Sequence, residues 1–266
     1  MFMARRTVIT TAATVIAAVV LTACDRSQDP GTATAQADAN AQVGPTGPRT
    51  PRLGYSNGKT YVVNPTSLNG STPDLRGTWR ATRQQLSGGD PAVAEAFNGA
   101  SHGVVRGQIA RALDGVDEGS SPWDFESAGQ VTFRDIVIAQ VITGTLYWGS
   151  KTTSFVGTVV IDTRTAKPVT FAGLFANERA GLERLSKQTK IIVPKANGWE
   201  GMVMPDVPGN APTAANFANW IPTVDGMEIF FPDNQFGIAP AQTITVPWRE
   251  LVDVLSPRMA GLAKGR

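Results

Sequence analysis

The chain has 266 residues and a nearly balanced charge, with 24 Lys or Arg and 22 Asp or Glu. This balance speaks against a nucleic-acid partner, which requires a strongly basic surface. The single cysteine, Cys24, excludes an intrachain disulfide. One cysteine and one histidine are too few for the usual sets of zinc ligands, so we expect no metal and no cofactor.

The N-terminus has the pattern of an export signal. Arg5 and Arg6 precede an uncharged run of 14 residues, 8–21, which suits the core of a signal peptide and is short for a membrane span. The run ends in Leu-Thr-Ala-Cys, which resembles the lipobox of bacterial lipoproteins. In this interpretation residues 1–23 are removed and Cys24 carries diacylglycerol and palmitate on the extracytoplasmic face of the cell membrane. An uncleaved anchor helix and a twin-arginine signal are the alternatives.

Residues 24–51 are predicted to form a disordered tether. They are rich in Ala, Thr, Gly, Pro and Gln and contain no aromatic or aliphatic cluster that could order them. The folded part is predicted to begin near Arg52. There, Asn57-Gly58 between two strand-like runs indicates a two-residue hairpin, and residues 77–87 form a further predicted strand.

A helix is predicted after Asp90-Pro91, because aspartate caps helix N-termini and proline suits the first turn. Gly99, Gly103 and Gly107 weaken this helix, and small residues four apart would allow it to pack closely on a sheet. The apolar residues at helical spacing are Val93, Phe97, Val104, Val105, Ile109 and Leu113.

Residues 99–103, Gly-Ala-Ser-His-Gly, match the G-x-S-x-G pattern that exposes the nucleophilic serine of many esterases. That serine sits on a turn between a strand and a helix, whereas Ser101 falls in the middle of the predicted helix. The only histidine, His102, is its neighbour, and neighbours on a helix do not face each other. Helix packing is therefore preferred to catalysis at Ser101. A Ser–Lys arrangement stays open, although the adjacent Ser186-Lys187 lie on a predicted surface helix.

An acidic loop at 114–119 contains Asp114, Asp117 and Glu118. It lacks the alternating acids of an EF-hand loop, so a helix end with a solvated turn is preferred to a calcium site. No glycine-rich phosphate loop or dinucleotide fingerprint is present in the sequence.

The second half of the chain is predicted to be mainly β-structure, with strands joined by short turns. This pattern predicts an α+β fold of antiparallel β-sheets, each packed with a helix, in two intimate subdomains, 52–150 and 151–266. The predicted elements are strands at 131–148 and 152–163, a turn at 166–168, a helix capped by Asn177 and ending near Lys190, a polar insert at 195–213, a hairpin over Asp225-Gly226, a strand at 243–247 and a final helix at 248–255.

Residues 158–175, TVVIDTRTAKPVTFAGLF, resemble a signature of the RsiV-like family, domain of unknown function 3298 (DUF3298): strand, Asp, turn, Lys or Arg, Pro, Leu-Phe. Residues 185–189 and 225–251 continue the resemblance and are most similar to the mycobacterial secreted immunogenic proteins of the MPT-sixty-four group. The likeness covers about residues 75–257. Two family features are missing, because residues 147–154 lack the Gly-Gly-Ala-His stretch and Phe236 or Ile238 stands near the place of a tyrosine.

RsiV is a membrane anti-sigma factor that binds lysozyme, so the resemblance implies lysozyme sensing or binding. Only seven residues precede the hydrophobic run, which leaves no room for a sigma-binding segment, so we expect no anti-sigma activity. Lysozyme is very basic, and residues 191–257 carry seven acidic against two basic side chains, a balance that permits such an interaction.

Three aromatic residues are candidates for a ligand-binding site. Tyr147 and Trp148 end a predicted strand, and Trp199 lies in the polar insert, where a core role is harder to supply. The alternative is that they belong to the core. The sequence thus predicts a lipid-anchored, non-catalytic binding protein of an actinobacterial cell envelope, whose partner could be an envelope or host protein. A weak serine esterase using Ser101 and an RsiV-like lysozyme-binding protein are the alternatives.

Overall fold

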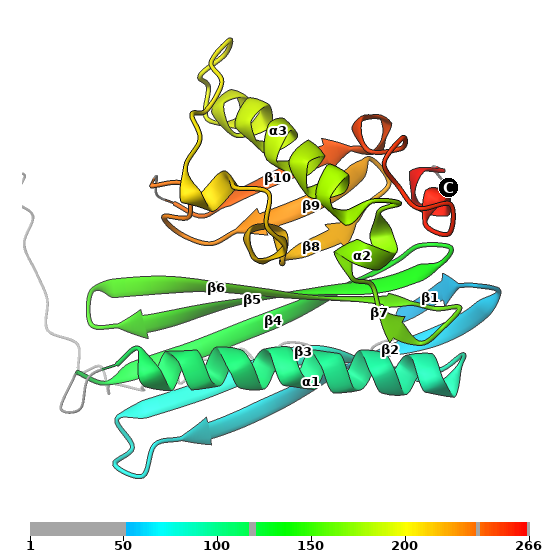
Figure 1. The fold of residues 1–266 in the computed structure, drawn as a ribbon. Coiled ribbons are helices and arrows are strands. Elements are labelled where there is room, and N and C mark those ends of the chain that lie inside the picture. Colours follow the sequence, from blue (N-terminus) through cyan, green and yellow to red (C-terminus); the bar gives the residue numbers. More distant parts are fainter. Residues whose placement is uncertain (1–51, 117–120, 238–239, 265–266) are drawn as a thin grey trace, which may run out of the picture. The chain divides into compact units, whose positions relative to one another are not determined.

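A large sheet carries much of the fold. The computed structural model describes residues 52–116, 121–237 and 240–264, and within them seven strands lie side by side in chain order (Figure 1). Neighbouring strands are antiparallel except β3 and β4, which are parallel and joined through helix α1. The elements are β1 (Arg52–Ser56), β2 (Lys59–Ser71), β3 (Gly77–Gly88), α1 (Pro91–Asp114), β4 (Trp123–Phe133), β5 (Val137–Trp148), β6 (Lys151–Asp162) and β7 (Lys167–Pro168).

A smaller antiparallel sheet and the other helices come from the rest of the chain. The strands of this small sheet lie in the order β10, β9, β8, so that β9 is central. The elements are α2 (Phe171–Leu174), α3 (Glu178–Ala196), β8 (Trp220–Pro222), β9 (Gly226–Phe231), β10 (Gln242–Pro247) and the 3-10 helices η1 (Pro208–Asn210), η2 (Ala214–Phe217), η3 (Trp248–Glu250) and η4 (Ala260–Ala263).

The two faces of the large sheet are covered by different elements (Figure 1). On β5, Ile138 and Ile142 pack in the clusters that contain the apolar side of α1. Val137, Ala139 and Val141 belong instead to the cluster that contains the small sheet and α3. Successive side chains of a strand point to opposite faces, so a strand covered on both sides is mostly apolar. The fold is therefore of the predicted α+β class, with the large sheet between α1 and the small sheet.

Several local signals act as the sequence predicted. Asn57 and Gly58 both have positive φ, 50° and 72°, and form the two-residue turn between β1 and β2. The Asp90 carboxylate accepts hydrogen bonds from two N–H groups in the first turn of α1. The Asn177 side chain accepts one from the first turn of α3, at 3.0 Å. The predicted hairpin and both predicted helix starts are confirmed.

The glycines of α1 correct one prediction. Gly99, Gly103 and Gly107 lie on the exposed side of the helix, and a Cβ added at any of them would have no neighbour within 4 Å. The close approach comes from the sheet instead: a Cβ on Gly157 of β6 would lie 2.5 Å from Cγ1 of Val104. The expectation that the helical glycines pack on a sheet was wrong, because other residues, among them Phe97, Val105 and Ile109, form the buried side of α1.

Helix α3 continues past its predicted end at Lys190 and includes Pro194. Proline has no N–H, so the Lys190 carbonyl loses its usual helical donor. The N–H of Met204 donates to that carbonyl at 2.9 Å. The segment after α3 therefore completes the hydrogen bonding that Pro194 leaves open, and it is held against the helix at this point.

The final helix predicted at 248–255 was wrong. Only η3 forms, and turns follow it. The N–H of Ala176 donates to the Val254 carbonyl, and the N–H of Ser256 donates to the Leu174 carbonyl, each at 2.9 Å. These bonds make a strand-like bridge to the segment after α2, and they use backbone groups that a continuing helix would need.

All described residues fall within one compact unit. The predicted signal peptide, Cys24 and the tether up to residue 51 lie outside the described residues, as do Asp117 and Glu118 of the acidic loop. The division of the folded part at residue 150 remains a prediction.

Candidate functional site

The hydroxyl of Ser101 is buried beneath α1 rather than exposed on a turn. Ser101 is 0% exposed, and its Oγ accepts a hydrogen bond from Nε2 of Gln140 at 3.3 Å. The same Gln140 amide exchanges two hydrogen bonds with the backbone of Gln84, at 3.0 and 3.1 Å. The pairing of β3 with β4 ends at Ala81 and Ser127, so this network fills the place where the two strands separate. Ser101 supports the sheet there, which agrees with the packing interpretation.

The aromatic candidates lie on separate elements. Tyr147, 47% exposed, and Trp148 end β5, where the ammonium of Lys151 lies 5.3 Å from the centre of the Trp148 ring. Trp199, 44% exposed, lies in the segment after α3, and its backbone N–H donates to the Pro194 carbonyl at 2.9 Å. No contact in the described part of the chain joins the three rings. Their role as ligand-binding residues remains a prediction.

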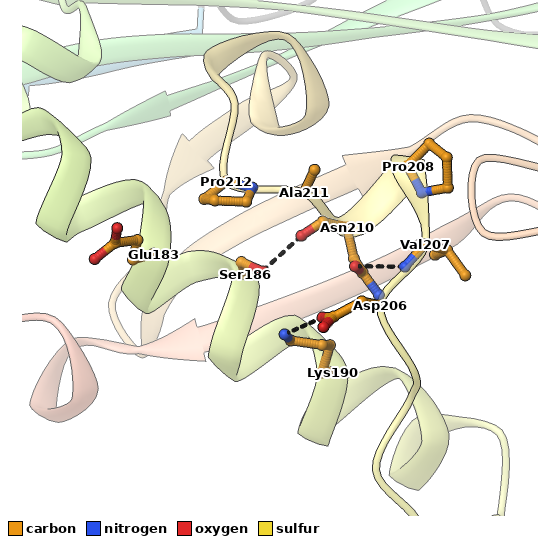
Figure 2. Close-up of a pocket in the computed structure, with 9 residues that line it drawn as sticks. All are labelled: Glu183, Ser186, Lys190, Asp206, Val207, Pro208, Asn210, Ala211 and Pro212. Atoms are coloured by element: carbon orange, nitrogen blue, oxygen red, sulfur yellow. Dashed lines mark hydrogen bonds and ion pairs between the residues drawn. The ribbon is translucent and has the colours of Figure 1, made fainter.

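A pocket of about 550 Å³ lies beside α3 (Figure 2). We call it the α3 pocket. Helix α3 forms one side, and the segment that leads through η1 forms the other, as Figure 2 shows. The lining residues are Glu183, Ser186, Lys190, Asp206, Val207, Pro208, Asn210, Ala211 and Pro212.

The polar side chains of the α3 pocket already have partners within the protein. Ser186 Oγ donates to the Asn210 carbonyl at 2.6 Å, and Lys190 Nζ pairs with Asp206 at 2.6 Å. The Asn210 side chain accepts from the Val207 N–H at 3.1 Å and donates to the Pro205 carbonyl at 2.8 Å. Figure 2 shows the first two bonds crossing from the helix to the segment, and the bond between Asn210 and Val207 lying within the segment. The first two bonds fasten the segment to α3, whereas the Asn210 side chain holds the segment's own turn. Ser186 and Lys190 each bond to another residue rather than to each other.

A second pocket, of about 400 Å³, lies where the large sheet meets the small sheet. We call it the inter-sheet pocket. Strands β1, β4 and β5 provide one side, and β8 and β9 with the turn between them provide the other. The lining residues are Arg52, Gln130, Val131, Thr132, Val141, Thr143, Ile221, Thr223, Glu228 and Phe230.

The alternation of β9 places Glu228 and Phe230 in this pocket. Met227, Ile229 and Phe231 are buried in the core cluster that contains α3. Glu228 and Phe230 lie between them in sequence, are half-buried, and line the inter-sheet pocket. Because side chains of a strand alternate, the apolar requirement on one face of β9 directs these two toward the large sheet.

Glu228 is the distinctive group of the inter-sheet pocket. In the described part of the chain, no side chain or backbone group forms a hydrogen bond or ion pair with its carboxylate. Burial raises the pKa of Glu228 above its ordinary value, since a carboxylate is harder to ionise when water is partly removed. A half-buried carboxylate without a partner is costly unless something binds it. This pocket, unlike the α3 pocket, holds a polar group that the fold leaves unused.

Arg52 lies at the edge of the same pocket. Its Nη2 donates to the Val131 carbonyl at 3.0 Å, which holds the guanidinium against β4. Thr132 and Thr143 add hydroxyls, and Gln130 adds an amide. The pocket thus combines one anionic group, one cationic group and neutral hydrogen-bonding groups, the mixture found in sites for small polar ligands.

None of these residues was among the sequence candidates. The one available signal is Glu228 itself, a charged residue in the apolar run of a predicted hairpin strand. The sequence does not show that β1, β4, β5 and β9 meet, because their residues are separated by up to 178 positions between Arg52 and Phe230.

Among the solved structures that share this fold are two proteins of one family. A DUF3298 family protein from Pseudomonas aeruginosa matches with a TM-score of 0.51 and 13% identity, over 77% of this chain and 97% of that chain. A DUF3298 family member from Bacteroides fragilis matches with a TM-score of 0.52 and 12% identity, over 79% and 99%. No family model matches the sequence, and no curated protein matches it.

These structural neighbours are DUF3298 family proteins, in agreement with the family resemblance of residues 158–175. At these identities the likeness shows a shared fold. The finer resemblance to RsiV-like proteins and to the MPT-sixty-four group remains a prediction, and so does lysozyme binding.

The described residues contain no group of three His, Cys, Asp or Glu side chains placed to hold a metal ion. Within the same part of the chain, no helix combines the length and the apolar character needed to cross a bilayer.

Proposed function

We propose that this protein is a lipid-anchored binding protein of the bacterial cell envelope, exposed outside the cytoplasm, and that the inter-sheet pocket is its ligand site. The observation that carries the binding role is the Glu228 carboxylate, which is half-buried in a pocket and has no partner among the described residues. A carboxylate that lines a pocket without a protein partner keeps its acceptor positions free for a ligand.

The envelope location is supported by the sequence pattern at residues 5–24, in which a basic pair and an apolar run precede the lipobox cysteine. The test is metabolic labelling with radioactive palmitate in the native host. We expect label in the wild-type protein and none in the Cys24→Ala variant. Equal labelling of both would contradict lipid anchoring at Cys24.

Binding is preferred to catalysis because the serine of the Gly-Ala-Ser-His-Gly stretch already has a structural role. A nucleophilic serine must expose its hydroxyl to substrate and hold it near a base, whereas the Ser101 hydroxyl is buried against Gln140. Hydrolysis of p-nitrophenyl esters that disappears in Ser101→Ala would overturn this part of the proposal.

The pocket itself is tested by screening mixtures of amino acids, short peptides and sugars with saturation-transfer NMR. Thr143→Trp would fill the inter-sheet pocket, since Thr143 lines it from β5. Thr145→Trp is the matched control, because Thr145 lies two residues further along the same strand and outside the lining. We expect compounds whose binding is lost in Thr143→Trp and kept in Thr145→Trp. Binding unaffected by Thr143→Trp, or no binding at all, would contradict the proposed site.

A further inference from the structure

Two opposite charges line the inter-sheet pocket without pairing. Glu228 comes from the central strand of the small sheet, and Arg52 comes from the edge strand of the large sheet. Ion pairs within 4.0 Å form elsewhere among the described residues, as between Arg184 and Asp253 at 2.8 Å, but Arg52 and Glu228 take part in none. The two charges face the same space from different sheets.

Each charge has binding capacity left over. The Glu228 carboxylate has two oxygens with free acceptor positions. The Arg52 guanidinium has five N–H donors, and the structure uses one hydrogen bond, from Nη2 to the Val131 carbonyl. That bond attaches one nitrogen of the guanidinium to β4 and leaves other N–H donors, which can form two parallel hydrogen bonds to a carboxylate.

The other residues that line the pocket restrict the size and the remaining chemical groups of a ligand. Thr132 and Thr143 offer hydroxyls, while Ile221 and Phe230 offer apolar surface. The hydroxyl of Thr223 already donates to the Gly226 carbonyl at 2.9 Å. A volume of about 400 Å³ suits a molecule of modest size.

We propose that the inter-sheet pocket binds a small zwitterion, with a ligand ammonium at the Glu228 carboxylate and a ligand carboxylate at the Arg52 guanidinium. This inference rests on the proposed function, since it names the ligand class of the same site. A charge-assisted hydrogen bond to a partly desolvated carboxylate is stronger than a bond from a neutral hydroxyl. A ligand that carries both charges satisfies both residues in one molecule.

A set of four peptides tests the two charges separately. Alanyl-alanine carries both charges, its amide carries the cation alone, N-acetyl-alanyl-alanine carries the anion alone, and N-acetyl-alanyl-alanine amide carries neither. Each is titrated at pH 7.0 by NMR chemical shifts into the purified protein, and glucose serves as a neutral sugar probe. The variants are Glu228→Gln and Arg52→Gln, with Glu95→Gln on the exposed side of α1 as the control.

We expect alanyl-alanine to bind most tightly and each missing charge to weaken binding by about tenfold, as is typical of hydrogen bonds to charged groups. Glu228→Gln should remove the advantage of the ammonium and leave that of the carboxylate. Arg52→Gln should do the reverse, and Glu95→Gln should change neither.

Equal affinity for the four peptides would overturn the zwitterion, and so would a Glu228→Gln variant that weakens N-acetyl-alanyl-alanine as much as alanyl-alanine amide. Saturable binding of glucose that Thr143→Trp abolishes, without preference for charge, would also overturn it while leaving the proposed pocket in place. Binding of none of the five probes would overturn the zwitterion, and the outcome of the Thr143→Trp screen would still decide the proposed function separately.

Discussion

The α3 pocket and the inter-sheet pocket have similar chemistry and different hydrogen bonding. Both are lined by acidic and basic side chains, by hydroxyl and amide groups and by apolar side chains. In the α3 pocket Lys190 pairs with Asp206, and Ser186 bonds to the carbonyl of Asn210. In the inter-sheet pocket Arg52 and Glu228 remain apart. The larger pocket is therefore a place where the fold fastens one segment to another, and the smaller one keeps its charges available.

This difference shows that the size of a pocket and its residue types do not by themselves identify a site. What distinguishes the two is whether the polar atoms already have partners. Polar groups that are satisfied within the protein contribute to stability, whereas an unsatisfied group lowers stability and gains a partner only when a ligand binds. Substitutions should therefore affect the two pockets in opposite ways.

The largest effect is expected at Asn210, which is 1% exposed. Asn210→Ala leaves the Val207 N–H and the Pro205 carbonyl without their partner, which should cost about 2–3 kcal/mol of unfolding free energy. Urea unfolding followed by circular dichroism measures it. The control is Asn64→Ala, an exposed residue bonded to Ser87 at 3.3 Å, for which we expect about 0.5 kcal/mol or less. An equal loss of unfolding free energy in Asn210→Ala and Asn64→Ala would contradict a stabilising role for the hydrogen bonds of the α3 pocket.

Ser101 resembles the α3 pocket in having its hydroxyl already bonded. Ser101→Ala removes one of the two acceptors of the Gln140 amide nitrogen and should cost about 1 kcal/mol in the same urea experiment. Ser87→Ala, at an exposed position of β3, is the control and should be close to neutral. An unfolding free energy unchanged by Ser101→Ala would show that this hydrogen bond does not stabilise the place where β3 and β4 separate.

Glu228→Gln is expected to stabilise the protein at neutral pH by less than about 1 kcal/mol, because water still reaches the half-exposed carboxylate and reduces the cost of its charge. The folded state raises the pKa of Glu228, so it holds the proton more tightly than the unfolded state does. The stability of the wild type should therefore fall as pH rises from about 4.5 through the raised folded pKa. The glutamine variant lacks this loss, so its advantage should be present above that pKa and vanish below about 4.5. Thermal unfolding across this range measures it, and a destabilised variant at pH 7 would contradict an unpaired carboxylate.

The smallest effect is expected at Asp206. Its side chain is 89% exposed, and water screens the ion pair with Lys190. Asp206→Asn should cost about 0.5 kcal/mol or less, and added salt should reduce the difference further. A loss as large as that of Asn210→Ala would show that the exposed ion pair between the segment and α3 stabilises the protein as much as the buried amide of Asn210 does, and would contradict this ranking.

Much of the fold follows from local signals in the sequence. The turn residues Asn57 and Gly58 and the cap residues Asp90 and Asn177 each satisfy backbone groups nearby, so their effect does not depend on distant parts of the chain. Most of β4, residues 123–130, was missed, although buried and exposed residues alternate from Trp123 onward. Charged, small and polar residues alternate with the apolar ones in this part of β4. A search for continuous apolar runs therefore assigns it to a loop.

The remainder depends on contacts between segments far apart in sequence. The last predicted helix failed because the backbone of Val254 bonds to Ala176, a partner that no local pattern reveals. The inter-sheet pocket could not be predicted for the same reason, since Arg52, Gln130 and Glu228 meet only when both sheets have formed. The candidate serine was found by its motif, and its burial against Gln140 became visible only in the structure.

The most direct test of the central claim is to titrate the Glu228 carboxyl carbon by NMR, in the free protein and with saturating alanyl-alanine amide. We predict that the pKa of Glu228 in the free protein lies above the ordinary glutamate value of 4.5 and falls when the cationic peptide binds, because the ammonium stabilises the ionised carboxylate. A pKa at the ordinary value that the peptide does not change would contradict an unpaired, ligand-accessible carboxylate in the inter-sheet pocket.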